Sequence, residues 1–183
     1  MEVSMKNRSI VFTAPYVTEI LDEEIPKISD DQVLVRILRS TVSAGTERAN
    51  LIGDANVNST KAPLVKFPRR CGYCSAGRVV AAGERVTSVK VGDLVACSWS
   101  KYSTYNALPE TSVYKLDGRV SLENGSMMHI ATFPMAAVRK CKVEIGESAL
   151  VMGLGILGLM AVKILRAAGA TPIIAVDPIA EKI

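Results

Sequence analysis

The chain has 183 residues, of which 49% are hydrophobic and 22% are charged. This balance is typical of a globular protein with a sizeable core and excludes a disordered chain. The net charge of +4 comes from 22 basic and 18 acidic residues that are scattered along the chain, and only nine aromatic residues (five Tyr, three Phe, one Trp) accompany them, so we expect no nucleic-acid partner.

The sequence carries no sign of secretion or of membrane insertion. The first residues lack the apolar run of a signal peptide, and the longest apolar stretch, near Leu150, is interrupted by glycines. Four cysteines without a secretory signal are typical of reduced thiols. We therefore expect a cytoplasmic protein with no membrane partner.

The first two thirds of the chain have the pattern of a β-rich domain. Short β-branched runs separated by Gly and Pro turns predict strands, and a segment rich in Asn, Pro and Lys predicts a loop over 53–68. The predicted strands are 9–13, 33–38, 77–82 and 94–99.

A helical pattern follows over 121–140, with an apolar face that includes Met128, Ala131 and Met135. Pro134 is expected to kink or interrupt this helix because proline lacks an amide hydrogen. The composition changes near 143–148, and a new strand begins there.

The clearest motif is Gly153-Leu154-Gly155-Ile156-Leu157-Gly158, a G-x-G-x-x-G pattern. The buried-strand run Ala149–Met152 precedes it, a helix is predicted over 159–168, and a second strand over 171–176 ends at Asp177. This order of elements is typical of the first β-α-β unit of a dinucleotide-binding domain. The alternative is a purely structural β-α-β unit.

Each part of the motif has a physical role. Gly153 permits a tight turn, Gly155 lets the backbone approach a pyrophosphate, and Gly158 allows close helix–strand packing. The helix N-terminus offers free N–H groups to the phosphates. The predicted cofactor-binding residues are Gly153, Gly155, Ile156, Leu157, Gly158 and Asp177.

Asp177 favours NAD over NADP. A carboxylate at the end of the second strand can accept both ribose hydroxyls but repels a 2′-phosphate. Pro178 follows directly, and the nearest cation is Lys182.

Two further stretches carry a family resemblance. "GRVVAAGERVTSVKVGDLVA" and "VEIGESALVMGLGILGLMAVKILRAAGA" resemble, in order and separation, the signature hairpin and the start of the nucleotide domain of the medium-chain dehydrogenase/reductase superfamily, which includes zinc alcohol dehydrogenases. The resemblance implies a GroES-like catalytic domain, a small distorted barrel with a trailing helical segment, over 1–145. It implies the first β-α-β unit of a Rossmann domain over 146–183.

The departures from this family concern the metal ligands. Where zinc members have a Cys-Gly-Thr-Asp-like motif, this chain has Ala44-Gly45-Thr46-Glu47, and where they have Gly-His-Glu it has Gly72-Tyr73-Cys74. The third ligand position falls on His129, the only histidine. The structural zinc lobe would need four cysteines, and only Cys97 lies in that region. We therefore predict no metal ligand set and no zinc.

Cys71 and Cys74 have C-x-x-C spacing, for which three interpretations are open. The cysteines are plain structural residues, a non-standard metal site with His129, or a redox pair. The first is favoured because the residues after Cys74 resemble a strand, whereas a redox pair normally lies at a helix N-terminus. Cys97 and Cys141 have the character of buried small hydrophobic residues.

Without zinc, charge that develops on the substrate oxygen must be met by hydrogen-bond donors. The resemblance places Thr46, Tyr73 and His129 in that role as catalytic residues. Their structural alternatives are a helix N-cap for Thr46, a strand-edge aromatic for Tyr73 and a packed core histidine for His129.

The expected activity is hydride transfer between NAD(H) and a small alcohol, polyol or carbonyl substrate by an alcohol dehydrogenase-like oxidoreductase. The alternatives are a metal or thiol sensor that uses Cys71, Cys74 and His129, and a non-catalytic NAD-binding module. A dinucleotide domain has six strands, so we expect the chain to be about the first half of an enzyme that is inactive alone. The open edge of 171–176 invites pairing with another chain, and we expect a homo-oligomer.

Overall fold

The computed structural model describes residues 6–54 and 66–183. The chain divides into two compact units, Met1–Met128 and His129–Ile183. The sequence placed a domain boundary after residue 145, whereas in the structure the helix before that point belongs to the second unit.

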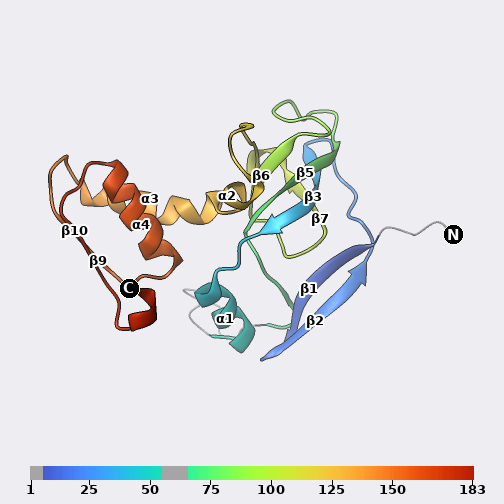
Figure 1. The fold of residues 1–183 in the computed structure, drawn as a ribbon. Helices are drawn as coiled ribbons and strands as arrows, with labels where there is room; N and C mark the ends of the chain where they lie inside the picture. Colours follow the sequence, from blue (N-terminus) through green and yellow to red (C-terminus); the bar gives the residue numbers. More distant parts are fainter. Residues whose placement is uncertain (1–5, 55–65) are drawn as a thin grey trace. The chain divides into compact units, whose positions relative to one another are not determined.

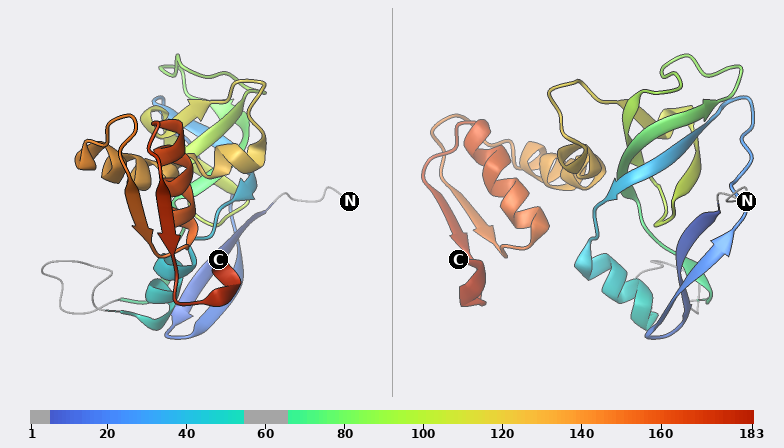
Figure 2. Two further views of the ribbon diagram at one scale, coloured as in Figure 1. Left: turned by 60° about the vertical axis from the view of Figure 1, so that its left-hand side comes forward. Right: turned by 45° about the vertical axis from the view of Figure 1, so that its right-hand side comes forward.

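The first unit is built around a curled five-stranded antiparallel sheet (Figures 1 and 2). Its order is β7-β3-β5-β6-β8, from strands β3 (Gln32–Ser40), β5 (Cys74–Ala82), β6 (Leu94–Ser98), β7 (Tyr105–Pro109) and β8 (Val113–Lys115). The register of β3 against β5 shifts at two places, and such bulges increase the local bend and twist of a sheet. Inward-facing valines such as Val33, Val35, Val79 and Val95 form its fully buried core.

Within the described residues, this unit also contains a second sheet of order β2-β1-β4 and three short helical segments. The strands are β1 (Asn7–Ala14), β2 (Val17–Glu23) and β4 (Arg69–Arg70), and the helices are α1 (Ala44–Ile52), α2 (Leu122–Ser126) and the 3₁₀ turn η2 (Glu110–Ser112). Gly53 closes α1 in the left-handed conformation at φ +72°, a conformation that glycine adopts without strain.

The second unit contains α3 (Met128–Cys141), β9 (Ala149–Met152), α4 (Ile156–Ala167), β10 (Ile173–Val176) and the 3₁₀ turn η3 (Ala180–Lys182). β9 and β10 are parallel, in register from Ala149 opposite Ile173 to Met152 opposite Val176. Val151, Leu165 and Ala170 form its buried core. Successive side chains of a strand point to opposite faces, so the exposed residues of both strands share one face, the exposed sheet face: Leu150, Met152, Ile174 and Val176.

Most predicted elements are confirmed: the four early strands lie in β1, β3, β5 and β6, and the β-α-β unit is present. Of the two effects expected of Pro134, a kink or an interruption of the helix, the interruption does not occur. The helix breaks at Met127 instead, and α3 continues through a buried Pro134, whose fixed φ suits a helix. Most of the predicted loop over 53–68, residues 55–65, lies outside the described residues.

Two smaller findings bear on function. Cys97 is buried as predicted, but Cys141 is exposed, because it lies at the end of α3. Within the described part of the chain, no helix has the length and hydropathy that crossing a membrane requires.

Candidate functional site

The glycine motif forms the turn between β9 and α4, and its glycines differ in their surroundings. Gly153 has φ +94°, and a Cβ added at Gly153 or Gly155 would meet no atom within 4 Å. At Gly158 an added Cβ would collide with the carbonyl of Gly153. The loop is therefore open at Gly153 and Gly155 and tightly packed at Gly158, which is the arrangement that a pyrophosphate cradle needs.

The N-terminus of α4 adds hydrogen-bond donors beside this loop. The first intrahelical bond runs from the Leu159 amide to the Gly155 carbonyl at 2.9 Å. The amides of Ile156, Leu157 and Gly158 precede it, so they have no intrahelical acceptor. Glycine at the N-cap has no side chain to occupy them, and the helix dipole favours an anion there.

Asp177 lies at the end of β10 and holds the glycine loop. Its Oδ2 accepts a hydrogen bond from the Leu154 amide at 2.7 Å and its Oδ1 accepts one from the Ile179 amide at 2.9 Å. The side chain is only 4% exposed, and Lys182 Nζ lies 3.9 Å from Oδ2. The Leu154 amide is the main cause that lowers the pKa of Asp177, with the Ile179 amide second. A carboxylate has about four acceptor positions, so two remain for ribose hydroxyls.

Thr46 lies exposed in the first turn of α1. The N-cap of α1 is Ser43, so the interpretation of Thr46 as an N-cap is wrong. The Ser43 hydroxyl donates to Thr46 Oγ1 at 3.2 Å. Because Thr46 accepts this bond, its own hydroxyl proton is left to donate elsewhere.

The segment from Cys71 to Cys74 is held in place by its backbone. The carbonyls of Cys71, Tyr73 and Cys74 accept from the amides of Tyr102, Trp99 and Thr41, respectively, at 2.9–3.1 Å. Gly72 has φ +106°, and a side chain there would press on the backbone of 100–102. This fixed backbone presents the half-buried Tyr73 just before β5.

A buried polar cluster below this segment was not found by sequence analysis. Glu47 is 7% exposed, its Oε1 accepts from the Tyr102 hydroxyl at 2.9 Å, and its Oε2 accepts from Asn50 Nδ2 at 3.4 Å. Burial, and then the charge of Glu47, raise the pKa of Cys71 to about 11 and raise that of Tyr102 as well. The acid in the Ala-Gly-Thr-Glu stretch was the only available signal.

His129 belongs to the second unit, in the first turn of α3. Its ring meets Phe133 edge to face, with ring centroids 5.8 Å apart, and its carbonyl accepts from the Thr132 hydroxyl at 2.6 Å. Partial burial lowers the pKa of His129 below its usual value, so the imidazole is neutral at pH 7. Thr46 and Tyr73 lie in the first unit, and their role with His129 stays a prediction.

The residues at the positions of the family's zinc ligands do not fit a zinc ion. Ala44 offers no ligand atom, and the phenol of Tyr73 is a poor zinc ligand because its ordinary pKa is about 10. Among residues 6–54 and 66–183, no three His, Cys, Asp or Glu side chains come close enough together to hold a metal ion. Among the described residues, none of the four cysteines forms a disulfide.

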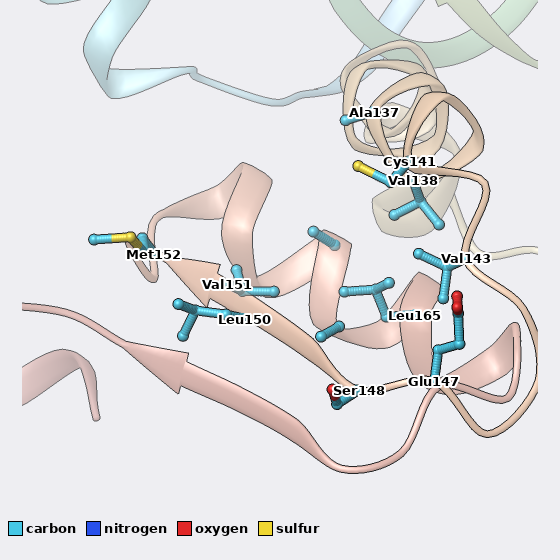
Figure 3. A pocket seen from close by; sticks show the side chains of 12 residues that line it. Ala137, Val138, Cys141, Val143, Glu147, Ser148, Leu150, Val151, Met152 and Leu165 are labelled. Atoms are coloured by element: carbon cyan, nitrogen blue, oxygen red, sulfur yellow. The ribbon is translucent and has the colours of Figure 1, made fainter.

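The second unit also has an apolar pocket of about 770 Å³ between α3, β9 and α4 (Figure 3). Aliphatic side chains dominate its wall, and Glu147 and Ser148 supply the few polar atoms. It offers no converging set of donors for chemistry.

A curled antiparallel sheet followed by a glycine-rich β-α-β unit is the architecture of a medium-chain dehydrogenase/reductase. The sequence pattern of the alcohol dehydrogenase GroES-like domain matches residues 29–143, and the chain belongs to that family.

Relatives and solved structures agree with this assignment. The chain is 30% identical over 189 residues to L-threonine 3-dehydrogenase of Caldanaerobacter subterraneus, covering 87% of this chain and 53% of the relative. It is 28% identical over 202 residues to D-xylulose reductase A of Aspergillus niger, covering 94% of this chain and 55% of the relative. A crystal structure of an alcohol dehydrogenase from Escherichia coli CFT073 with NADH has the same fold, with TM-score 0.84, 21% identity, and coverage of 97% and 58%. The chain thus spans about half the length of the curated relatives that it matches.

Proposed function

We propose that the protein is an NAD-dependent oxidoreductase that transfers a hydride between NAD(H) and a small alcohol, polyol or carbonyl substrate without catalytic zinc. The observation that carries the proposal is the loop between β9 and α4, open at Gly153 and Gly155 and fixed by Asp177. Relatives named D-xylulose reductase A and L-threonine 3-dehydrogenase support the substrate class.

The chain's own residues divide the task of holding the cofactor. The free amides at the start of α4 would receive the pyrophosphate, and the two remaining acceptor positions of Asp177 would receive ribose hydroxyls. Asp177 also keeps the Leu154 amide occupied, which fixes the loop before any ligand arrives. NAD, when bound, supplies or takes up the hydride.

Substrate polarisation falls to hydrogen-bond donors. Thr46 can donate because its hydroxyl accepts from Ser43 and so keeps its own proton, and Tyr73 lies on a backbone segment held by three hydrogen bonds. His129 is neutral at pH 7, so one ring nitrogen carries a proton to donate. We propose these three residues as the catalytic donors to the substrate oxygen.

The test of the cofactor assignment is Asp177→Ala in the full-length protein, with Asp117→Ala, which removes an exposed carboxylate paired with Arg119, as the matched control. We expect NAD to bind about ten- to a hundredfold more weakly to the Asp177 variant, the cost of a lost charged hydrogen bond, while NADP binds equally or better. A loosened loop alone would weaken both cofactors equally. The NAD:NADP affinity ratio therefore separates the two effects, and an unchanged ratio would contradict ribose binding by Asp177.

The test of the chemistry is turnover of a panel of alcohols, polyols and carbonyls by the full-length protein with NAD(H), run alongside metal analysis. We expect turnover without stoichiometric zinc, and Tyr73→Phe should lower kcat. NAD binding with no turnover across the panel would favour a non-catalytic module, and stoichiometric zinc would overturn the zinc-free proposal.

A further inference from the structure

The first unit contains a polar pocket of about 500 Å³ that the proposed activity does not use. Its walls come from β1, β4, β7, the end of β2 and the turn after β6. Neither Thr46 nor Tyr73 lines it. Its volume lies within the usual range for small-ligand sites.

The charged side chains of this pocket have a net charge of +1. Glu23 accepts from the Ser9 hydroxyl at 2.7 Å and is ion-paired with Arg70, so these charges compensate each other. The Ser9 bond, followed by Arg70, lowers the pKa of Glu23, so this carboxylate is ionised at pH 7. Lys101 lines the same pocket, and its ammonium forms no ion pair with any residue in the described part of the chain.

Two buried side chains present open hydrogen-bond donors to the pocket. Asn7 is 6% exposed, and its Oδ1 accepts from the Tyr105 amide at 2.8 Å. This bond fixes which amide atom is the nitrogen, and Asn7 Nδ2 has no partner among the described residues, although solvent reaches it. Ser112 is 9% exposed, lines the pocket, and its hydroxyl likewise has no side-chain bond within the described ranges. These donors are available to water when the pocket is empty, and they can donate instead to an anion that enters it.

An aromatic surface completes the site. Trp99 lines the pocket, is 66% exposed, and is the only tryptophan of the chain. Its backbone is held in the left-handed region at φ +58°, and its amide donates to the Tyr73 carbonyl at 2.9 Å. The indole is thus an apolar face attached to a fixed turn, next to a cation and open donors.

We propose that this pocket binds a small organic monoanion, a carboxylate on a flat apolar body. Lys101 and the open donors of Asn7 and Ser112 receive the carboxylate, and the body lies against the indole of Trp99. The charged side chains of the pocket sum to +1. A doubly charged anion would therefore keep one negative charge without a partner.

Benzoate is the probe, and the fluorescence of the single Trp99 is the reporter. We expect saturable binding of benzoate and none of benzamide, its neutral analogue of the same shape, at equal concentrations. Inorganic phosphate, which lacks the flat body, should not saturate the signal. A benzamide response equal to that of benzoate, a phosphate-only response, or no saturable response would overturn the proposal.

Variants locate the site. Lys101→Ala should lower the affinity for benzoate about ten- to a hundredfold, the loss expected for a charged hydrogen bond. Lys90→Ala, which removes an exposed lysine outside the pocket, should leave the affinity unchanged. Asn7→Asp keeps the acceptor for Tyr105 and replaces the open donor by a carboxylate, so it should also abolish binding. Equal affinities of the two lysine variants would contradict the assignment, and because Lys101 is exposed its loss does not threaten the fold.

Discussion

Glu47 is a carboxylate placed inside the first unit, and its partners decide whether that placement is tolerable. The Tyr102 hydroxyl donates to it, Asn50 lies within reach, and the Cys71 thiol is close by. A buried carboxylate without donors is strongly destabilising. Burial of Glu47 could not be predicted from sequence, because Tyr102 reaches it from a distant turn.

Tyr102→Phe tests this interaction. The variant keeps the ring but removes the only hydroxyl shown to donate to Glu47 Oε1, so we expect the free energy of unfolding to fall by about 1–3 kcal/mol. Urea unfolding measures it, with the exposed Tyr114→Phe as control. Equal midpoints for the two variants would show that Glu47 finds another donor.

The cysteines should differ sharply in reactivity. Burial raises the pKa of Cys71 to about 11 and that of Cys97 to about 12, so both thiols are protonated at pH 8, whereas Cys141 is exposed. Thiolates, not thiols, are alkylated. We expect iodoacetamide at pH 8 to modify Cys141 first, as located by peptide mass spectrometry, and Cys141→Ser to remove the fast phase. Rapid labelling of Cys71 would contradict its burial.

These raised pKa values also make the stability of the fold depend on pH. A folded-state pKa above the unfolded value of about 8.5 means that the protonated thiol is favoured in the folded state. The resulting stability is fully present below pH 8.5 and is lost as the pH rises toward 11 for Cys71.

At the scale of elements, sequence patterns predicted those with a regular apolar signal. The valine-rich strands and the β-α-β unit were found because each has a strand length or helix length of apolar residues. β2 was missed because most of its residues are exposed and, in the described part of the chain, it pairs only with β1, so it has no buried face to impose alternation. α1 was anticipated only through the alternative that Thr46 is a helix N-cap, because its buried residues, Glu47 and Asn50, are polar and give no apolar pattern.

The glycine loop offers a matched pair of variants. Gly158→Ala should destabilise the second unit by about 1–3 kcal/mol, because its Cβ collides with the Gly153 carbonyl and backbone must move. Gly155 has an ordinary φ and open space around an added Cβ, so Gly155→Ala should leave the stability unchanged. The new methyl group should lower the affinity for NAD, because it lies where the phosphates approach. Thermal unfolding and NAD titration measure the two effects separately. Equal stability of both variants would contradict the close packing at Gly158.

At the scale of the whole molecule, the family and the β-α-β unit with its glycine-rich turn were accessible from sequence because they depend on local order along the chain. The hydrogen bond from the Leu154 amide to Asp177 was not, since it joins the ends of the two separate strands β9 and β10. The pocket at Trp99 was also missed, because its walls come from positions as far apart as Asn7 and Ser112.

The exposed sheet face of β9 and β10 will govern how this chain behaves at high concentration. Leu150 lies opposite Ile174 and Met152 opposite Val176, so four exposed apolar side chains form one continuous surface. Light scattering of the 183-residue chain should show attraction between molecules that grows with salt, because added ions screen the repulsion of its +4 charge. Ile174→Lys should turn the attraction between molecules into repulsion. Ile145→Lys, the same change at an exposed residue outside the sheet, should alter the attraction only slightly. Identical scattering of the two variants would mean that net charge, and not this surface, sets the solubility limit.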